Sequence, residues 1–181
     1  MSTLKEVIDG VNEPITLEDA KEHLRVTGGD EDTYISYIIT AARTYVENEL
    51  GETLHESTYN YYLNGFPSGD IETPKPPLIS VTYVKYYDTD NVLQTLVEDT
   101  DYRVDVNSST IEVIDSWPST YDRKSSVQIR FISGYENLDE IEALRIHAMK
   151  LKLSVLYDDR HSAADEKGLI SLMNKLKEPS F

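Results

Sequence analysis

A block of strand-like sequence between two stretches of helix-like sequence is the strongest constraint on the fold of this chain. The block opens with Pro74-Lys75-Pro76-Pro77-Leu78-Ile79-Ser80-Val81. Proline cannot donate a backbone hydrogen bond, so this opening is predicted to be extended but not to lie in the middle of a sheet. Residues 79–87 alternate between two faces and predict a strand. Residues 88–91 predict a turn and residues 92–97 a returning strand, which together make a β-hairpin.

Further strands are predicted on both sides of this hairpin. Residues 55–63 alternate loosely and are rich in tyrosine, and residues 71–73 form a short extended piece before the prolines. Residues 102–106 and 110–114 predict a second hairpin around Asn107-Ser108-Ser109. Residues 126–133 predict the last strand, because Val127, Ile129 and Phe131 alternate with polar residues.

Four helices are predicted in the flanks of the strand-rich middle. Thr16 suits the N-cap of a short helix that Gly28-Gly29 ends, and residues 30–50 carry isoleucines at helical spacing before Gly51. A third helix is predicted from about residue 137 to 157 and a short fourth helix from about 164 to 176. Residues 1–15 show no strong period and are predicted to be a loose lead-in.

The predicted fold class is therefore α+β. We expect a helical core of two N-terminal helices, a long central helix and a short C-terminal helix, with a β-rich antiparallel insert between the second and third helices. The whole chain, residues 1–181, is expected to form a single domain. The helical core would comprise about residues 16–51 and 137–177, and the insert about residues 54–134.

Charge and composition exclude several classes of function. The formal net charge is −16, which argues against a protein that grips nucleic acid by neutralising phosphates. A like-charged wall past which DNA slides remains compatible with this charge. Cysteine is absent, so disulfides and cysteine-based metal sites are excluded. The chain has no apolar run of membrane-spanning length and no signal-peptide pattern at its N-terminus, which predicts a soluble cytosolic protein.

No catalytic constellation stands out in the sequence. The four histidines, His23, His55, His147 and His161, show no ligand spacing on one helix face, and His147 is predicted to lie on a helix surface or interface. Asp158-Asp159-Arg160-His161 is predicted to be a helix end and turn, since it lacks the alternating ligands and glycine of a calcium loop. The sequence contains no nucleophile elbow, phosphate loop or dinucleotide fingerprint. We therefore predict no enzyme activity, no metal and no cofactor.

Tyrosine and one unusual helix indicate candidate subunit contacts. The chain has 13 tyrosines against three phenylalanines, and tyrosine suits both ordinary sheet packing and interfaces. The third helix is apolar on two sides, so it is either central in the fold or buried against a neighbouring subunit. The candidate subunit-interface residues are Tyr83, Tyr86, Tyr87, Tyr102, Ile146, Met149 and Leu153.

The order and spacing of several short segments resemble one family. The segments are residues 17–26, Asp32-Thr33-Tyr34-Ile35, residues 41–47, Leu63-Asn64-Gly65-Phe66-Pro67, residues 76–81, Tyr86-Tyr87-Asp88-Thr89-Asp90, Asp101-Tyr102-Arg103-Val104-Asp105 and Phe131-Ile132-Ser133-Gly134-Tyr135. Together they cover about residues 15 to 160. On these segments the chain resembles the head–tail connector, or adaptor, proteins of tailed phages, especially the branch known from prophage and gene-transfer-agent clusters.

The resemblance implies a structural protein of the virion, made in the host cytoplasm. Such proteins assemble as a homo-oligomeric ring under the portal, extend its DNA channel and provide a platform for the next head-completion or tail protein. DNA would pass through without sequence-specific binding, and no membrane is involved. Whether the isolated chain is a ring or a monomer stays open. Because the family's C-terminal region engages the portal, the portal-contact candidates are Leu169, Ile170, Leu172, Met173 and Leu176.

Two other functions remain as alternatives at this point. The first is a different virion assembly factor of similar fold, such as a stopper or tail-completion protein. The second is an enzyme or ligand-binding domain, because a site built only from carboxylates leaves no sequence signature.

Overall fold

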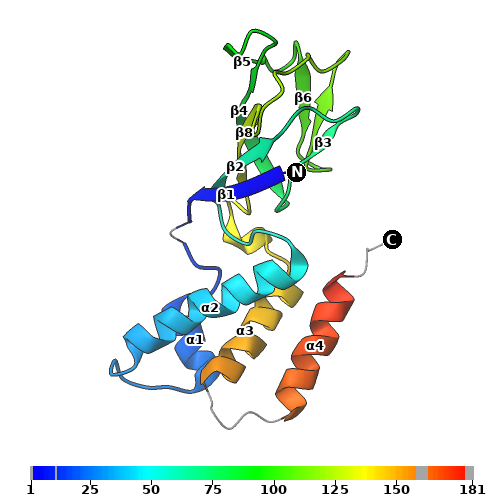
Figure 1. Ribbon diagram of the computed structural model, residues 1–181. Coiled ribbons are helices and arrows are strands. Elements are labelled where there is room, and N and C mark those ends of the chain that lie inside the picture. The colour runs from blue at the N-terminus through cyan, green and yellow to red at the C-terminus, as the bar shows by residue number, and fades with distance from the viewer. Residues whose placement is uncertain (1, 11, 158–162, 178–181) are drawn as a thin grey trace. The chain divides into compact units, whose positions relative to one another are not determined.

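The computed structural model describes residues 2–10, 12–157 and 163–177 (Figure 1). The chain forms two compact units. The sandwich unit comprises Met1–Gly10 and His55–Glu136, and the helical unit comprises Val11–Leu54 and Asn137–Phe181. Each unit therefore combines two segments that are distant in the sequence.

The larger sheet of the sandwich unit has five antiparallel strands. Their order across the sheet is β1 (Ser2–Ile8), β2 (Ser57–Leu63), β8 (Val127–Ser133), β4 (Leu78–Tyr87) and β5 (Leu93–Thr95). The predicted hairpin of β4 and β5 is confirmed, and the Asp88 side chain closes its turn by accepting from the Val92 amide at 2.9 Å. β8 lies in the centre, where Val127, Ile129 and Phe131 face the core as predicted.

A second sheet of three strands completes the sandwich unit. Its order is β3 (Ile71–Glu72), β7 (Thr110–Val113) and β6 (Tyr102–Asp105). Ile71, Ile111 and Tyr102 from this sheet share one hydrophobic core with Val84 and Phe131 of the larger sheet. The two sheets thus pack face to face, and each presents its other face outward.

The part of the helical unit that the structure describes contains four α-helices. They are α1 (Leu17–Leu24), α2 (Asp32–Leu50), α3 (Ala143–Tyr157) and α4 (Ala163–Lys177). The predicted caps Thr16 and Gly51 are confirmed: the Thr16 hydroxyl accepts from the Asp19 amide at 3.1 Å, and Gly51 ends α2 with φ of +73°. The predicted stop at Gly28-Gly29 is too late, because α1 ends at Leu24 with Arg25 as its C-cap. α3 contacts α1, α2 and α4, and Figure 1 shows it between α2 and α4.

The predicted fold class is wrong in its topology. We expected one β-rich insert within a helical core, but the described residues form four α-helices and two separate antiparallel sheets with eight strands. The expected lead-in contributes the strand β1, which pairs with β2 from Ser2 opposite Leu63 to Ile8 opposite Thr58. The β-rich part is therefore not a simple excursion between two helices, because its first strand precedes all four helices.

The predicted start of the third helix is also too early. A short 3-10 turn, η1 (Leu138–Glu140), comes first, and α3 begins at Ala143. The Asn137 side chain caps this turn by accepting from the Asp139 amide at 3.1 Å. The acidic residues that suggested the first turn of one long helix thus belong to a separate turn.

Candidate assembly surfaces

Helix α3 obtains most of its burial inside the subunit. Met149 and Leu153 are fully buried, together with Ala148, whereas Ile146 is half-buried. The two apolar sides of α3 face α2 and α4, which corresponds to the first of the two predicted alternatives, a helix central in its fold. Contact with a neighbouring subunit stays a prediction for Ile146, Met149 and Leu153. Of these three, only Ile146 has side-chain surface exposed in the described chain.

Helix α4 presents one buried side and one exposed side. Leu169 and Met173 are buried, Leu172 and Leu176 are half-buried, and Ile170 is 52% exposed. The Lys177 ammonium lies 2.8 Å from Glu49 Oε2 and ties the end of α4 to α2. Portal contact stays a prediction for all five candidates. Ile170 is the one that offers a large apolar surface without any rearrangement.

The candidate tyrosines lie in both sheets, with Tyr83, Tyr86 and Tyr87 in β4 and Tyr102 in β6. Tyr102 is 3% exposed in the shared core, and burial raises the pKa of its phenol above the usual range. Tyr86 packs edge-on against Phe66 with ring centroids 5.7 Å apart, and its pKa is also raised by burial. Tyr83 and Tyr87 alternate onto the outer face of the sheet, where both are half-buried. Ordinary sheet packing therefore accounts for Tyr86 and Tyr102.

The outward-facing tyrosines lie under positive charges. The Lys85 ammonium is 4.5 Å and the Arg130 guanidinium 5.3 Å from the centre of the Tyr83 ring. The Arg123 guanidinium lies 4.0 Å from the centre of the Tyr87 ring. Such contacts contribute about 0.5–1 kcal/mol at exposed sites and fix the positions of the charged groups.

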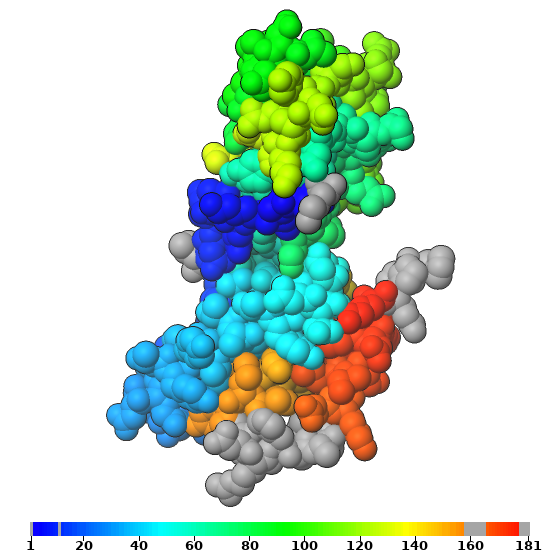
Figure 2. Space-filling model, in the orientation of Figure 1, coloured from blue at the N-terminus to red at the C-terminus, as the bar shows by residue number. Residues whose placement is uncertain are grey.

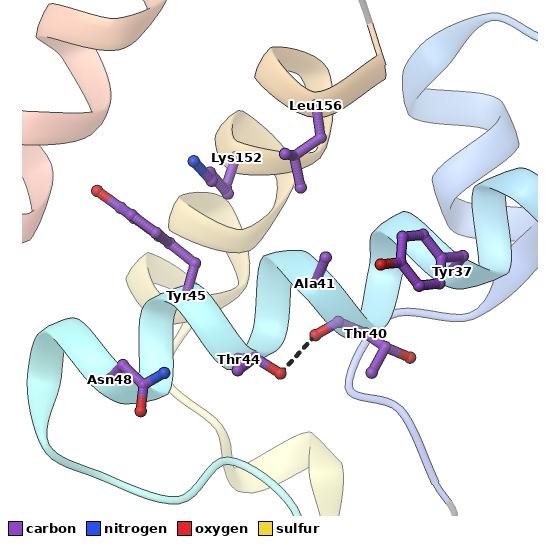
Figure 3. Close-up of a pocket in the computed structure, with 8 residues that line it drawn as sticks. All are labelled: Tyr37, Thr40, Ala41, Thr44, Tyr45, Asn48, Lys152 and Leu156. Carbon is purple, nitrogen blue, oxygen red and sulfur yellow. Dashed lines mark hydrogen bonds between the residues drawn. The ribbon is translucent and has the colours of Figure 1, made fainter.

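A shallow, mostly apolar groove of about 450 Å³ lies between α2 and α3 (Figure 3). Tyr45 and Lys152 both line the groove, and the Lys152 ammonium lies 4.0 Å from the centre of the Tyr45 ring. Tyr37, which is 73% exposed, lies along α2 toward its start. The sequence signal for this groove was the set of tyrosines that broaden the apolar side of the second helix.

A second hollow, of about 430 Å³, lies in the sandwich unit. Phe66 and Pro67 line it together with Tyr61 and Asp70. The Phe66 ring stacks on Trp117 with centroids 4.6 Å apart, and the Trp117 indole donates to the Gly69 carbonyl at 2.7 Å. The loop of residues 65–70 is thus held by aromatic packing and by the Trp117 hydrogen bond.

Sequence reasoning missed a buried ion-pair network in the helical unit. Arg43 donates to Glu13 and to Glu47, each at 2.9 Å, and Arg43 is only 5% exposed. Glu47 also accepts from the Leu54 amide at 2.8 Å. Arg43 and Glu47 stand four residues apart, which was the available signal, although this spacing is equally typical of an exposed helix pair.

His55 holds the N-terminal strand segment within the sandwich unit. Its imidazole Nε2 lies 2.7 Å from the Asp9 carboxylate and 3.2 Å from the Ser57 hydroxyl. Both partners meet the same ring nitrogen, so the three residues do not form a relay in which carboxylate and hydroxyl contact opposite nitrogens. We interpret the group as a structural link between the end of β1 and the start of β2.

Within residues 2–10, 12–157 and 163–177, no three His, Cys, Asp or Glu side chains gather as metal ligands. His147 is exposed on α3, as predicted. His161 and the Asp158–His161 segment lie outside the described residues. Among the described helices, none has both the length and the apolar character needed to cross a membrane.

The fold is similar to that of chains in gene transfer agent (GTA) particles. The neck of an empty GTA particle computed with C6 symmetry contains a chain that matches with a TM-score of 0.80 and 20% identity. That match covers 99% of this chain and 97% of the other. A virion of a native GTA particle gives the same values, and the neck of a native GTA particle computed with C12 symmetry gives 0.78 and 18% identity over the same shares. No curated protein matches the sequence.

These similarities define the fold class, a four-helix unit combined with a two-sheet sandwich as found in virion necks. The model of the phage gp6-like head-tail connector proteins matches residues 14–114, which is more than half of the chain. The chain therefore belongs to the phage gp6-like head-tail connector family. The predicted resemblance is confirmed, and the chain is a structural head–tail connector protein.

Proposed function

We propose that this chain forms a homo-oligomeric ring at the head–tail junction of a virion, next to the portal. The ring extends the DNA channel and presents a platform for the next head-completion or tail protein. The family match over residues 14–114 carries the proposal. The similarity to neck chains of particles with C6 and C12 symmetry supports it, because cyclic symmetry is that of a closed ring.

Within this ring the whole chain acts as one connector domain without catalytic activity. The net charge of −16 suits a wall past which DNA slides, because like charges repel the phosphates. The chain would be made in the host cytoplasm and end in the virion. The exposed surface of α4 around Ile170 is the candidate contact to the portal.

Co-purification with the portal protein of the same gene cluster tests the proposal. We expect the full chain to bind the portal and to give ring-shaped particles in electron micrographs. If the chain does not bind the isolated portal but binds an already assembled portal–connector complex, the result would favour a stopper or tail-completion role instead.

A pair of matched substitutions tests the α4 contact. Ile170→Glu places a charge on an exposed apolar site of α4, and we expect it to weaken portal binding at least about tenfold. Val97→Glu makes the same change at a site that is 59% exposed in the sandwich unit, and portal binding should persist. Equal portal binding by the two variants would exclude Ile170 from the contact.

A further inference from the structure

The outer face of the five-stranded sheet carries positive charges and no carboxylate. Lys5 lies opposite Asn60, Asn60 opposite Arg130, and Arg130 opposite Tyr83. Lys85 lies in the neighbouring row of the same face, because it is two residues from Tyr83. We call Lys5, Lys85 and Arg130 the basic face. Glu6 is the only carboxylate in the five strands, and it alternates to the core side, opposite Tyr59.

The basic face is held in place by contacts of its own. The Arg130 Nε donates to the Asn60 side-chain oxygen at 2.9 Å. Lys85 and Arg130 both lie against the Tyr83 ring, as described above. Lys5 is exposed, and Lys85 and Arg130 are half-buried. The charges of Lys85 and Arg130 are therefore positioned before any partner arrives, which lowers the entropy lost on binding.

The opposite side of the sandwich unit is acidic. In the three-stranded sheet Tyr102, Val104 and Ile111 face the core, so their neighbours in the strands face outward. The outward side chains include three carboxylates and one cation, Arg103, which lies opposite Glu112. We call the carboxylates the acidic face: Glu72, Asp105 and Glu112. Glu72 and Asp105 both lie opposite Thr110, on different sides of β7, so all three carboxylates stand on the same outward face, one from each strand.

We propose that the basic face of one subunit packs on the acidic face of a second copy of this chain. The inference rests on the proposed function, because a ring needs a head-to-tail interface between two different surfaces of the subunit. The sandwich unit supplies two such surfaces of opposite charge on its two sides. This complementarity selects the register and direction of the ring more than it adds affinity.

A second copy fits the basic face better than nucleic acid does. A nucleic-acid-binding domain is typically basic overall, with a pI above about 9, whereas this chain has a pI of about 4.5. Three cations neutralise few phosphates, so they give little of the counterion release that drives binding to DNA. The acidic face of a neighbouring copy presents three carboxylates to these cations, and Arg103, opposite Glu112, is the one cation among them.

Charge reversal on each face provides the test. Lys5→Glu/Lys85→Glu makes the basic face acidic, and Glu72→Lys/Glu112→Lys makes the acidic face basic. We expect each double variant to lose self-association at least about tenfold in sedimentation at low salt, because like charges then face each other. An equal mixture of the two double variants, and the quadruple variant, should regain self-association.

Controls separate these effects from misfolding and from net charge. Circular dichroism should show that every variant is folded. Arg25→Glu/Lys167→Glu lowers the net charge by the same amount as Lys5→Glu/Lys85→Glu, at two exposed sites of the helical unit, and its self-association should match that of the wild type. The wild type and all variants are then mixed with the portal protein, and ring formation on the portal is scored in electron micrographs.

The outcomes distinguish the interface from the proposed function. If wild-type rings form on the portal and all reversed variants form them equally well, the interface is wrong and the function stands. If the wild type does not bind the portal, the proposed function fails, and sedimentation alone tests the interface. The proposed interface is then overturned if the wild type does not self-associate, or if charge reversal does not change its self-association. Binding of duplex DNA that is lost in Lys5→Glu/Lys85→Glu, with self-association unchanged, would also overturn it and assign the basic face to nucleic acid.

Discussion

At the residue scale, Gly134 is a position with no room for a side chain. Its φ is +113°, and a Cβ at this site would lie 2.1 Å from the carbonyl oxygen of His55. Its amide donates to the Pro77 carbonyl at 2.9 Å, which joins the end of β8 to the start of β4. A backbone atom cannot move away as the end of a flexible side chain can, so any substitution must displace the chain around His55.

We expect Gly134→Ala to lower the free energy of unfolding by at least about 2 kcal/mol, through strain at a positive φ and the steric clash. Gly69→Ala is the matched control, because a Cβ at Gly69 meets nothing within 4 Å. Chemical denaturation measures both variants. A loss of similar size at the two sites would contradict this account of Gly134.

Arg43 shows the difference between a buried and an exposed ion pair. Arg43→Met leaves Glu47, which is 8% exposed, without the positive charge of its partner, and we expect a loss of about 3–5 kcal/mol. Lys177→Met breaks the exposed pair with Glu49 and should cost about 1 kcal/mol or less. Urea denaturation of the two variants provides the comparison, and equal losses would be inconsistent with it.

The buried phenol of Tyr102 makes the sandwich unit less stable at alkaline pH. Burial raises the pKa of its phenol in the folded state above the unfolded value of about 10. The contribution is therefore fully present below about pH 10 and is lost as the pH rises through the folded pKa. Tyr102→Phe should lose less stability in denaturation experiments between neutral and alkaline pH. A smaller pH dependence of stability should remain in Tyr102→Phe, because the pKa of Tyr86 is also raised in the folded state. An unchanged pH dependence would refute the role of Tyr102.

At the scale of elements, the sequence predicts those whose signal is local. Helix α2 combines isoleucines at helical spacing with a glycine that adopts the left-handed conformation, so its range is predicted almost completely. β8 alternates cleanly because one face is buried. β1 has neither signal: it is an edge strand, six of its seven residues are exposed, and its partner β2 begins more than 50 residues later.

The candidate assembly surfaces follow the same distinction. The sequence predicts that α3 and the tyrosines are apolar surfaces, but it cannot tell which of them the chain itself covers. Met149 and Tyr102 prove to be buried within their own units. The cations around Tyr83 come from strands that are distant in sequence, so only the register of the sheet brings Lys5, Lys85 and Arg130 onto one face.

Strand β1 is expected to protect the edge of β2. Figure 2 shows β1 at the surface of the sandwich unit, in dark blue. A variant without residues 2–8 loses the backbone partners on one edge of β2, which stays paired with β8 on its other edge, and loses the contact of Leu4 with the core. We expect faster hydrogen exchange at the β2 amides that face β1, measured by mass spectrometry, because an unpaired edge opens readily. Peptides from the β4–β8 pair are the internal control, and unchanged protection of β2 would contradict the role of β1.

At the scale of the whole molecule, the proposed function depends on surfaces that become complete only in an assembly. The described residues offer two shallow hollows and two oppositely charged sheet faces, which suit contacts between proteins. A connector of this kind is expected to act through the number and order of its neighbours in the particle.

Deletion of the gene should therefore block particle assembly at a defined stage. We expect heads without tails in electron micrographs of the producing strain, because the platform for the next protein is missing. A plasmid copy of the full chain should restore tailed particles, whereas a copy that carries Gly134→Ala should restore fewer. Normal tailed particles in the deletion strain would argue against a connector role.

The assembly of each unit from two distant segments has a consequence for synthesis on the ribosome. The apolar side of α2, with Ile35, Ile39 and Val46, is complete once residue 50 is made, but its cover α3 ends at Tyr157. At about 5–20 residues per second, roughly 100 further residues take about 5–20 s. During this time the nascent chain exposes the apolar side of α2. Strand β1 stays unpaired until β2 has been made, and β2 lacks its second partner until β8 has been made. Such a chain is a natural client for ribosome-associated chaperones.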